Sequence, residues 1–321
     1  MEIPAVLKSL GVDPDEVLSD SGIEPELFSD PGNLITYKAR DRLFQQSVVR
    51  TGCPYFGLLV GKRMDLSSLG LVGLLMKTSP TVEAALRNLG DYLHLHAQGA
   101  VITLKLDDDL AMLTYHTFES GLEAADQTGD GAVAMMLNVL RSLCGPGFRP
   151  IEASFAHRKP ADIEPYRKVL RTPLYFDAEQ YALVFPRTCL NIRPPGSDSD
   201  LQRLLKEQID TLDSAHSLNL PDQVRSVLRS ALTTGRATEQ QIAALFSMTP
   251  RTFARRLKEQ GTSFHELIDE CRFEISRQML TNTSRSVAEI GVSLGYSRAS
   301  SFIRAFRRWS GCTPGQWRRN S

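Results

Sequence analysis

A repeated hydrophobic pattern marks the C-terminal third of the 321-residue chain. Segments 237–261 and 286–311 each have the pattern of a short helix, a tight turn and a second helix rich in arginine. In both second helices, apolar residues three or four positions apart form one stripe, as expected for the buried face of an amphipathic helix. The stripe residues are Phe253 and Leu257 in the first copy and Phe302, Phe306 and Trp309 in the second. The repeat predicts two helix-turn-helix modules in an all-α domain.

Helix-boundary residues strengthen this prediction. Thr238 and Gln241 have the spacing of a capping box, in which two side chains bind free backbone N–H groups at a helix start. We expect Thr249 to be the N-cap of the first arginine-rich helix, with Pro250 in its first turn. In the second copy, we expect Ser297 to cap the arginine-rich helix. Each copy therefore carries start signals of its own.

Residues 1–195 combine helical and strand patterns. The predicted helices are 4–10, 14–19, 25–28, 38–51, 56–61, 81–89, 122–143 and 163–170. The predicted strands are 101–106, 110–116, 151–157, 174–176 and 181–185. The first two strands flank Asp107-Asp108-Asp109, which predicts a hairpin. This order of elements predicts an α+β domain.

A segment rich in proline, glycine and serine at 193–200 predicts the end of this domain. The next apolar residues share one helical face: Leu201, Leu204, Leu205, Ile209 and Leu212. They predict a connecting helix that packs on either domain, with a dimerisation seam as the alternative. The expected organisation is an α+β domain over 1–195, a linker and connecting helix over 196–217, and an all-α domain over 218–321.

The charge distribution separates the two halves. The whole chain has 37 basic and 37 acidic residues and is formally neutral. Residues 218–321 contain 16 basic and 8 acidic residues, a net charge of +8, so residues 1–217 contain 21 and 29, a net charge of −8. Only Lys258 among those 16 is a lysine, and guanidinium groups favour bidentate binding to phosphate and guanine. A basic domain with two arginine-rich helices predicts binding to double-stranded DNA.

The end of the chain holds a dense motif. It comprises Gly295-Tyr296-Ser297, then Arg304-Ala305-Phe306-Arg307-Arg308-Trp309, and Thr313-Pro314 followed by Trp317-Arg318. This motif resembles the signature of AraC/XylS-type transcription regulators. Segment 248–258 is similar to the first recognition helix of that family, and 264–280 to the long helix that joins its two modules. The resemblance implies two recognition helices in successive major-groove segments, about 34 Å apart, on one face of the duplex.

The resemblance also implies where the contacts to DNA lie. The residues in base-reading positions are Arg251, Thr252, Arg255, Arg298, Ala299, Ser300, Ser301 and Arg304. The residues assigned to DNA phosphates are Arg256, Lys258, Arg307, Arg308 and Arg318, with intramolecular pairing as the alternative for the arginines. Ala254 and Ala299 cannot form a hydrogen bond with a base. The arginines are therefore expected to carry most of the sequence specificity.

The N-terminal half carries a weaker set of motifs, including Gly57-Leu58 with Gly61, and Phe155-Ala156-His157 with Pro160. Through them, residues 20–190 resemble the ligand-binding half of one branch of these regulators, a branch without the cupin barrel. This implies a regulator controlled by a small-molecule effector whose identity and binding residues are unknown. A domain used only for dimerisation is the alternative. RNA polymerase and a second copy of the chain are further candidate partners.

Other chemistries find less support. A metal sensor could use the histidines His94, His96, His116 and His157, but no Cys or carboxylate is spaced to complete a site. The five cysteines are odd in number and lack a Cys-x-x-Cys pair, which indicates a reduced, cytoplasmic protein. The sequence lacks a P-loop and a Gly-x-Ser-x-Gly motif. We therefore expect no enzyme activity, cofactor, metal or membrane span, and a DNA-tethered enzyme is the remaining alternative.

Overall fold

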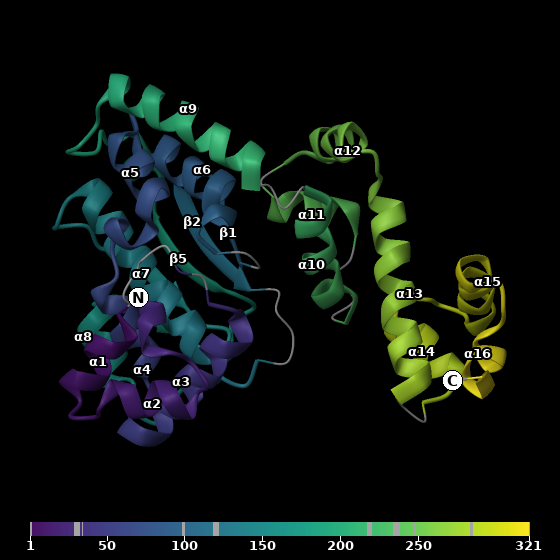
Figure 1. Cartoon of the computed structure of the whole chain (residues 1–321). Helices are drawn as coiled ribbons and strands as arrows, with labels where there is room; N and C mark the ends of the chain where they lie inside the picture. The colour runs from purple at the N-terminus through teal and green to yellow at the C-terminus, as the bar shows by residue number, and fades with distance from the viewer. Residues whose placement is uncertain are drawn as a thin grey trace. The chain divides into compact units, whose positions relative to one another are not determined.

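The computed structural model describes residues 2–28, 33, 35–97, 100–117, 122–216, 220–233, 238–246, 248–282 and 285–320 (Figure 1). The chain divides into two compact units, the first ending at His216 and the second comprising residues 217–321. Two points of the sequence predictions, the boundary at 217–218 and the start of the first repeat at Ala237, lie outside the described residues.

The first unit contains a five-stranded sheet with the strand order β1-β2-β5-β3-β4. The strands are β1 (Ala100–Asp107), β2 (Leu110–Thr117), β3 (Glu152–Ser154), β4 (Leu174–Tyr175) and β5 (Tyr181–Pro186). β3 and β4 pair in parallel, and the other neighbours are antiparallel. β1 and β2 form the predicted hairpin. The mixture of helices with this sheet confirms the predicted α+β class.

Helices cover the sheet and extend the unit beyond it (Figure 1). They are α1 (Ile3–Ser9), α2 (Pro14–Asp20), α3 (Tyr37–Thr51), α4 (Phe56–Arg63), α5 (Gly70–Thr78), α6 (Val82–Tyr92), α7 (Ala125–Cys144), α8 (Glu164–Leu170) and α9 (Ser199–His216). Short 3₁₀ helices lie at Pro25–Phe28, Leu66–Leu69, Leu93–Leu95 and Arg187–Asn191. The sequence prediction missed α5. That helix packs against α6, α9 and Leu66–Leu69, so most of its residues are apolar and no polar stripe reveals its period.

The strand register explains where the sheet meets the helical core. Along β2 and β5, the partners Ala111 and Phe185, then Leu113 and Leu183, are completely buried. The next pair on that face joins Tyr115 to Tyr181, because every second residue of a strand points the same way. α7 packs against both strands. Tyr115 and Tyr181 therefore bring two hydroxyl groups to the side of the sheet that faces the core.

α4 and α7 approach each other at two glycines. A Cβ atom built on Gly57 would lie 2.0 Å from the carbonyl oxygen of Gln127, and one on Gly61 would lie 2.0 Å from that of Gly131. Real Cβ atoms cannot approach backbone so closely. The motif glycines of the N-terminal half are therefore packing residues that let two helix backbones touch.

α9 belongs to the first compact unit. Leu205 and Ile209 are buried in the core of that unit, and α9 packs along α5. Leu201, Leu204 and Leu212 stay exposed. Of the predicted apolar stripe, Leu205 and Ile209 are thus the residues that pack in the core.

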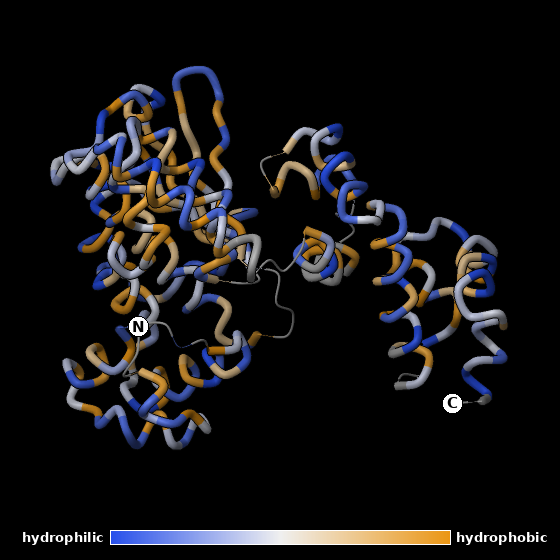
Figure 2. The backbone as a smooth tube through the Cα atoms, turned by 45° about the horizontal axis from the view of Figure 1, so that its top comes forward, coloured by the Kyte–Doolittle hydropathy of each residue, from blue (hydrophilic) through white to orange (hydrophobic). Residues whose placement is uncertain are grey.

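The second unit is helical, as predicted. Its helices are α10 (Leu220–Thr233), α11 (Glu239–Leu245), α12 (Pro250–Glu259), α13 (Phe264–Asn282), α14 (Val287–Ser293), α15 (Ala299–Ser310) and α16 (Pro314–Asn320). Figure 2 shows hydrophobic and hydrophilic residues alternating along these helices, as amphipathic packing requires. Two cores result, one per module, and Ile275 of the joining helix α13 packs against both.

Across the described part of the chain, every helix is too short or too polar to cross a membrane.

Candidate nucleic-acid interface

The first module is held by the predicted caps. Thr238 and Gln241 form a capping box at the start of α11. Thr249 caps α12, because its hydroxyl accepts a hydrogen bond of 3.2 Å from the backbone N–H of Thr252. The Thr249 hydroxyl also donates to Thr252 Oγ1 over 3.0 Å. Thr252, predicted to read a base, is thus half-buried and already part of the cap.

The outward face of α12 is basic. Phe253 and Leu257 are completely buried, as predicted. The opposite side of the helix carries exposed residues at i, i+3, i+4 and i+7: Arg251, Ala254, Arg255 and Lys258. Arg255 lies 3.7 Å from Glu259, but both side chains are more than half exposed, and such a surface pair is weak. α12 therefore presents cations that are available to a polyanion.

The second module begins with a capping box that the sequence prediction overlooked. The Ser286 hydroxyl accepts a hydrogen bond of 3.2 Å from Glu289 N–H, and Glu289 Oε2 accepts one of 2.7 Å from Ser286 N–H. These hydrogen bonds lower the pKa of the Glu289 carboxyl. The signal was present as Ser-x-x-Glu before an apolar stripe. Both modules therefore start with the same device.

Close packing then sets the turn of the second module. A Cβ on Gly291 would lie 3.1 Å from Phe302 Cβ, so this glycine lets α14 and α15 approach. Gly295 in the turn has a φ of +83°, which glycine adopts without strain. Phe302 and Phe306 are completely buried, as predicted, and Trp309 packs against the same core.

The start of α15 differs from the prediction. The N-cap residue is Arg298 rather than Ser297, and its side chain makes no capping hydrogen bond. Ser297 lies one residue too early, because the helix begins at Ala299. The first N–H groups of a helix have no acceptor within the helix itself. An uncapped helix start next to exposed arginine is suited to binding an anionic oxygen.

Three exposed residues form the outermost stripe of α15. Ser300, Arg304 and Arg307 lie at i, i+4 and i+7, opposite the buried phenylalanines. Ala299 and Ser301, which were also predicted to face bases, are half-buried at the edges of this stripe. Arg307, which the sequence assigned to a phosphate, therefore lies on the same outward stripe as Arg304, at its C-terminal end.

The remaining predicted phosphate contacts fall into two groups. Arg256 and Lys258 are exposed. Arg308 is paired with Asp269 of α13 over 2.6 Å. Arg318 donates to the carbonyl oxygens of Leu280 over 3.2 Å and Arg285 over 2.6 Å. For Arg308 and Arg318 the intramolecular alternative is thus present in the structure.

The first unit holds a separate polar network around Asp130 of α7, which is 1% exposed. Asp130 Oδ1 lies 2.8 Å from His157 Nε2, and Asp130 Oδ2 accepts a hydrogen bond of 2.5 Å from the Tyr166 hydroxyl. His157 Nδ1 lies 2.8 Å from the carbonyl oxygen of Arg158. Both ring nitrogens therefore face acceptors, which suits a doubly protonated imidazolium. Sequence reasoning had named His157 as a candidate metal ligand and had not paired it with Asp130.

Aromatic rings enclose this pair. The rings nearest to His157 belong to Phe155, Phe176, Tyr181 and Tyr166, with centroids 5.6 to 6.3 Å away. Within the described residues, no three His, Cys, Asp or Glu side chains are grouped so that they could hold a metal ion.

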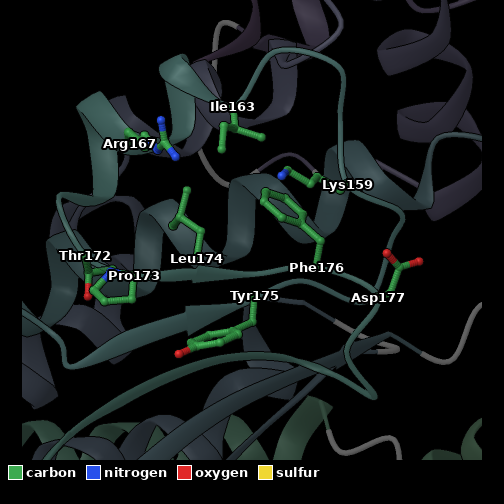
Figure 3. Close-up of a pocket in the computed structure, with 9 residues that line it drawn as sticks. All are labelled: Lys159, Ile163, Arg167, Thr172, Pro173, Leu174, Tyr175, Phe176 and Asp177. Carbon is green, nitrogen blue, oxygen red and sulfur yellow. The ribbon is translucent and has the colours of Figure 1, made fainter.

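A shallow pocket of about 360 Å³ lies beside the network. Figure 3 shows Leu174 and Phe176 pointing toward Ile163 next to α8, whereas Tyr175 points to the other side. Lys159 and Arg167 also line the pocket, and Arg167 is paired with Glu164 over 2.7 Å. The pocket therefore has an apolar floor, and its edge carries the basic residues Lys159 and Arg167 and the acidic residue Asp177.

Comparisons with known proteins cover both units. Residues 11–193 match the N-terminal arabinose-binding domain of AraC transcription regulators, and residues 242–320 match a helix-turn-helix domain. The chain is 26% identical to the HTH-type transcriptional regulator VirS of Mycobacterium tuberculosis, over 98% of this chain and 93% of that one. It is 25% identical to the ornithine utilization regulator of Pseudomonas aeruginosa, over 96% and 91%. Among solved structures, transcriptional regulator CdpR of Pseudomonas aeruginosa has a TM-score of 0.49 and 21% identity, over 95% of this chain and 96% of that one.

Proposed function

The chain belongs to the AraC family of transcription regulators, and we propose that it reads its operator through the outward faces of α12 and α15. It is a regulator with a DNA-binding helix-turn-helix domain and an N-terminal ligand-binding domain. The observation that carries the proposal is that α12 and α15 each have one buried apolar face and one exposed basic face. Each of them follows a partner helix, α11 or α14, that begins with a capping box. Two such helices are suited to two neighbouring stretches of major groove.

Base reading is assigned first to the residues at the centre of each face. Arg251, Arg255 and Arg304 can each pair in a bidentate way with guanine, and Ser300 can donate to or accept from a base edge. Ala254 on α12 can contact only a thymine methyl group. The other predicted base contacts, at the edges of the two faces, are secondary in this scheme: Thr252, Arg298, Ala299 and Ser301.

Phosphate binding is assigned to exposed cations around these centres. Arg256 and Lys258 flank the face of α12, and Arg307 extends that of α15. The uncapped start of α15 adds backbone N–H groups at the positive end of a helix dipole. Such contacts fix the register of a protein on the duplex without reading sequence.

Regulation is assigned to the N-terminal unit. A small-molecule effector can change transcription only if it binds two arrangements of the chain with different affinity. The net charge of −8 on residues 1–217 would keep that half away from the DNA backbone. We infer a regulatory rather than a catalytic role in the cytoplasm, with RNA polymerase and a second copy of the chain as proposed partners. The domain limits 1–195, 196–217 and 218–321 are kept as proposed functional divisions.

The test compares two arginines of one helix. A cognate duplex is first selected from random DNA with the full-length protein. Arg304→Ala should then lower affinity for that duplex by about 1–3 kcal/mol and leave affinity for a shuffled duplex nearly unchanged. Arg308→Ala is the matched control, because that guanidinium is already paired with Asp269. Equal losses of Arg304→Ala on both duplexes would rule out base reading by Arg304.

A further inference from the structure

One buried guanidinium in the first unit lacks an acceptor. On α3, Arg40 Nε and Nη2 are both shielded from solvent and form no hydrogen bond within the described structure. The hydroxyl of Tyr37, one turn earlier, is likewise buried without a hydrogen bond. The Arg40 guanidinium lies over the Tyr37 ring, 4.4 Å from its centroid. Three polar atoms are therefore gathered in the interior beside the Tyr115 hydroxyl, and Arg40 has no carboxylate partner among the described residues.

Such an arrangement is unfavourable unless something fills it. An arginine stays charged at all physiological pH values, and a buried donor without a partner destabilises a protein by about 1–3 kcal/mol, more for a charged group. Native proteins satisfy nearly all buried polar groups, so the exceptions call for a functional explanation. An anion is the partner that satisfies an unpaired buried guanidinium best.

The two free nitrogens define the shape of that anion. Nε and Nη2 form one edge of the planar fork, the edge that binds a carboxylate side-on. This chain uses the same edge elsewhere: Arg87 Nε and Nη2 donate to Glu83 Oε1 over 3.1 and 2.6 Å at the surface. Arg40 therefore has the donor geometry of a carboxylate site without the carboxylate.

The neighbouring acid of the chain is turned elsewhere. Asp41 follows Arg40 on α3 and is buried, but its oxygens accept from Ala124 N–H over 2.9 Å and Glu123 N–H over 3.1 Å. Gln45 Nε2 donates to the same carboxylate over 2.7 Å. Asp41 thus anchors the segment that leads into α7 and leaves Arg40 unpaired.

The surroundings of Arg40 add neutral donors. Tyr115 of β2 is 7% exposed, and burial raises the pKa of both Tyr115 and Tyr37, so the phenols stay protonated. His96 is an exposed residue, but the protein next to its imidazole ring partly desolvates the ring. This desolvation, followed by the charge of Arg40, lowers the pKa of His96. His96 is therefore neutral at neutral pH, and the charge of the cluster itself comes from Arg40.

We propose that Arg40, with the hydroxyls of Tyr37 and Tyr115, binds the carboxylate of a small organic acid, and that this acid is the effector class of the regulator. The flat edge formed by Arg40 Nε and Nη2 matches the two coplanar oxygens of a carboxylate. The inference rests on the proposed function, because it names the ligand class of the N-terminal domain.

The position of the site links it to the core. Tyr115 is in register with Tyr181 of β5, whose ring packs onto Gly129 of α7. A ligand bound by Arg40 and Tyr115 therefore contacts α3 and β2 directly. Through Tyr115 it is linked to Tyr181 of β5, which packs on α7. Filling the site should stabilise this unit, because a ligand that binds only the folded state raises its stability.

The first experiment measures the melting temperature of the full-length protein with paired probes. Benzoate and hexanoate supply a carboxylate, and benzamide and hexanamide are their uncharged twins. We expect at least one carboxylate to raise the melting temperature when its amide does not. Arg40→Met should abolish that shift. Arg50→Met is the matched control on α3, because Arg50 is exposed and paired with Asp20, and it should keep the shift.

A second measurement needs no ligand. Arg40→Met replaces an unpaired buried charge by an apolar chain of similar length, so it should raise the melting temperature of the free protein, whereas Arg50→Met should not. Failure of either experiment overturns the proposal. In the first, this means that acid and amide shift the melting temperature equally or not at all, or that Arg40→Met shows the same shift as the wild type. In the second, it means that ligand-free Arg40→Met has a lower melting temperature than the wild type. Operator binding is measured on the same samples, and its absence in the wild type would contradict the proposed function instead.

Discussion

At the scale of single residues, the arginines of the second unit differ by what their guanidinium groups already bind. Arg318 donates to the carbonyl oxygens of Leu280 in the last turn of α13 and of Arg285 beyond that helix, and Arg308 is paired with Asp269. Arg251 and Arg304 are exposed and form no ion pair with other described residues. An engaged arginine must lose an existing partner before it binds DNA, whereas an exposed one loses only water. The free arginines are therefore the better candidates for contacts that decide affinity.

The buried Asp130–His157 pair makes a pH dependence expected. Burial lowers the pKa of His157, but its hydrogen bond to Asp130 and the charge of Asp130 outweigh burial and raise it. Burial raises the pKa of the Asp130 carboxyl, and the contacts to His157 and Tyr166 oppose this only in part. Both groups hold protons more tightly in the folded than in the unfolded chain. Their stabilisation is complete below the ordinary pKa of each group and is lost as pH rises through the raised value.

We therefore predict that the free energy of unfolding of the full-length protein falls as pH rises above about 6.5, the ordinary pKa of histidine. Denaturant titrations at a series of pH values measure this slope. His157→Gln should flatten it, because glutamine does not titrate. His265→Gln is the control, since His265 is exposed on α13. An unchanged slope in His157→Gln would show that the pair does not hold the extra proton.

At the scale of helices and strands, local signals and long-range contacts divide what sequence can reveal. The caps at Thr238 and Thr249 and the stripe of Phe253 and Leu257 depend on residues within one turn, and they were predicted. α5 was missed because it is covered on several sides and lacks an amphipathic pattern. Ser297 was predicted as the N-cap of α15, but the N-cap is the next residue, Arg298. Helix boundaries depend on the final geometry of the turn.

The candidate sites follow the same division. The exposed positions of α12 and α15 could be predicted, because helical spacing from buried residues fixes which positions point outward. The Asp130 network could not be, because Asp130 and His157 lie on different elements and meet only after the sheet has formed. The unpaired state of Arg40 is likewise a property of its surroundings. A sequence shows which residues can donate but does not show which donors lack an acceptor.

The contact of α4 with α7 gives a prediction at this scale. Gly61→Ala would bring a methyl group into the backbone of Gly131, so the helices must separate and the core between them must open. We expect a loss of stability of about 3 kcal/mol or more, at the high end for single substitutions. Gly147→Ala is the control, because a Cβ there meets nothing within 4 Å. Thermal unfolding of both variants measures the difference, and similar stabilities would contradict the close approach.

At the scale of the whole molecule, the neutral sequence conceals an acidic unit joined to a basic one. Residues 218–321 carry a net charge of +8, and residues 1–217 carry −8. Binding to DNA is thereby expected in the C-terminal unit, and binding of ligands in the N-terminal unit. The two modules of the basic half share the joining helix α13, through which a change in one module can reach the other.

The central claim is that both modules engage one operator. Hydroxyl-radical footprinting of the full-length protein on its selected duplex tests it most directly. The account predicts two protected stretches on one face of the DNA, about 10 base pairs apart, one weakened in Arg251→Ala and the other in Arg304→Ala. A single protected stretch, or the same protection on shuffled DNA, would contradict it.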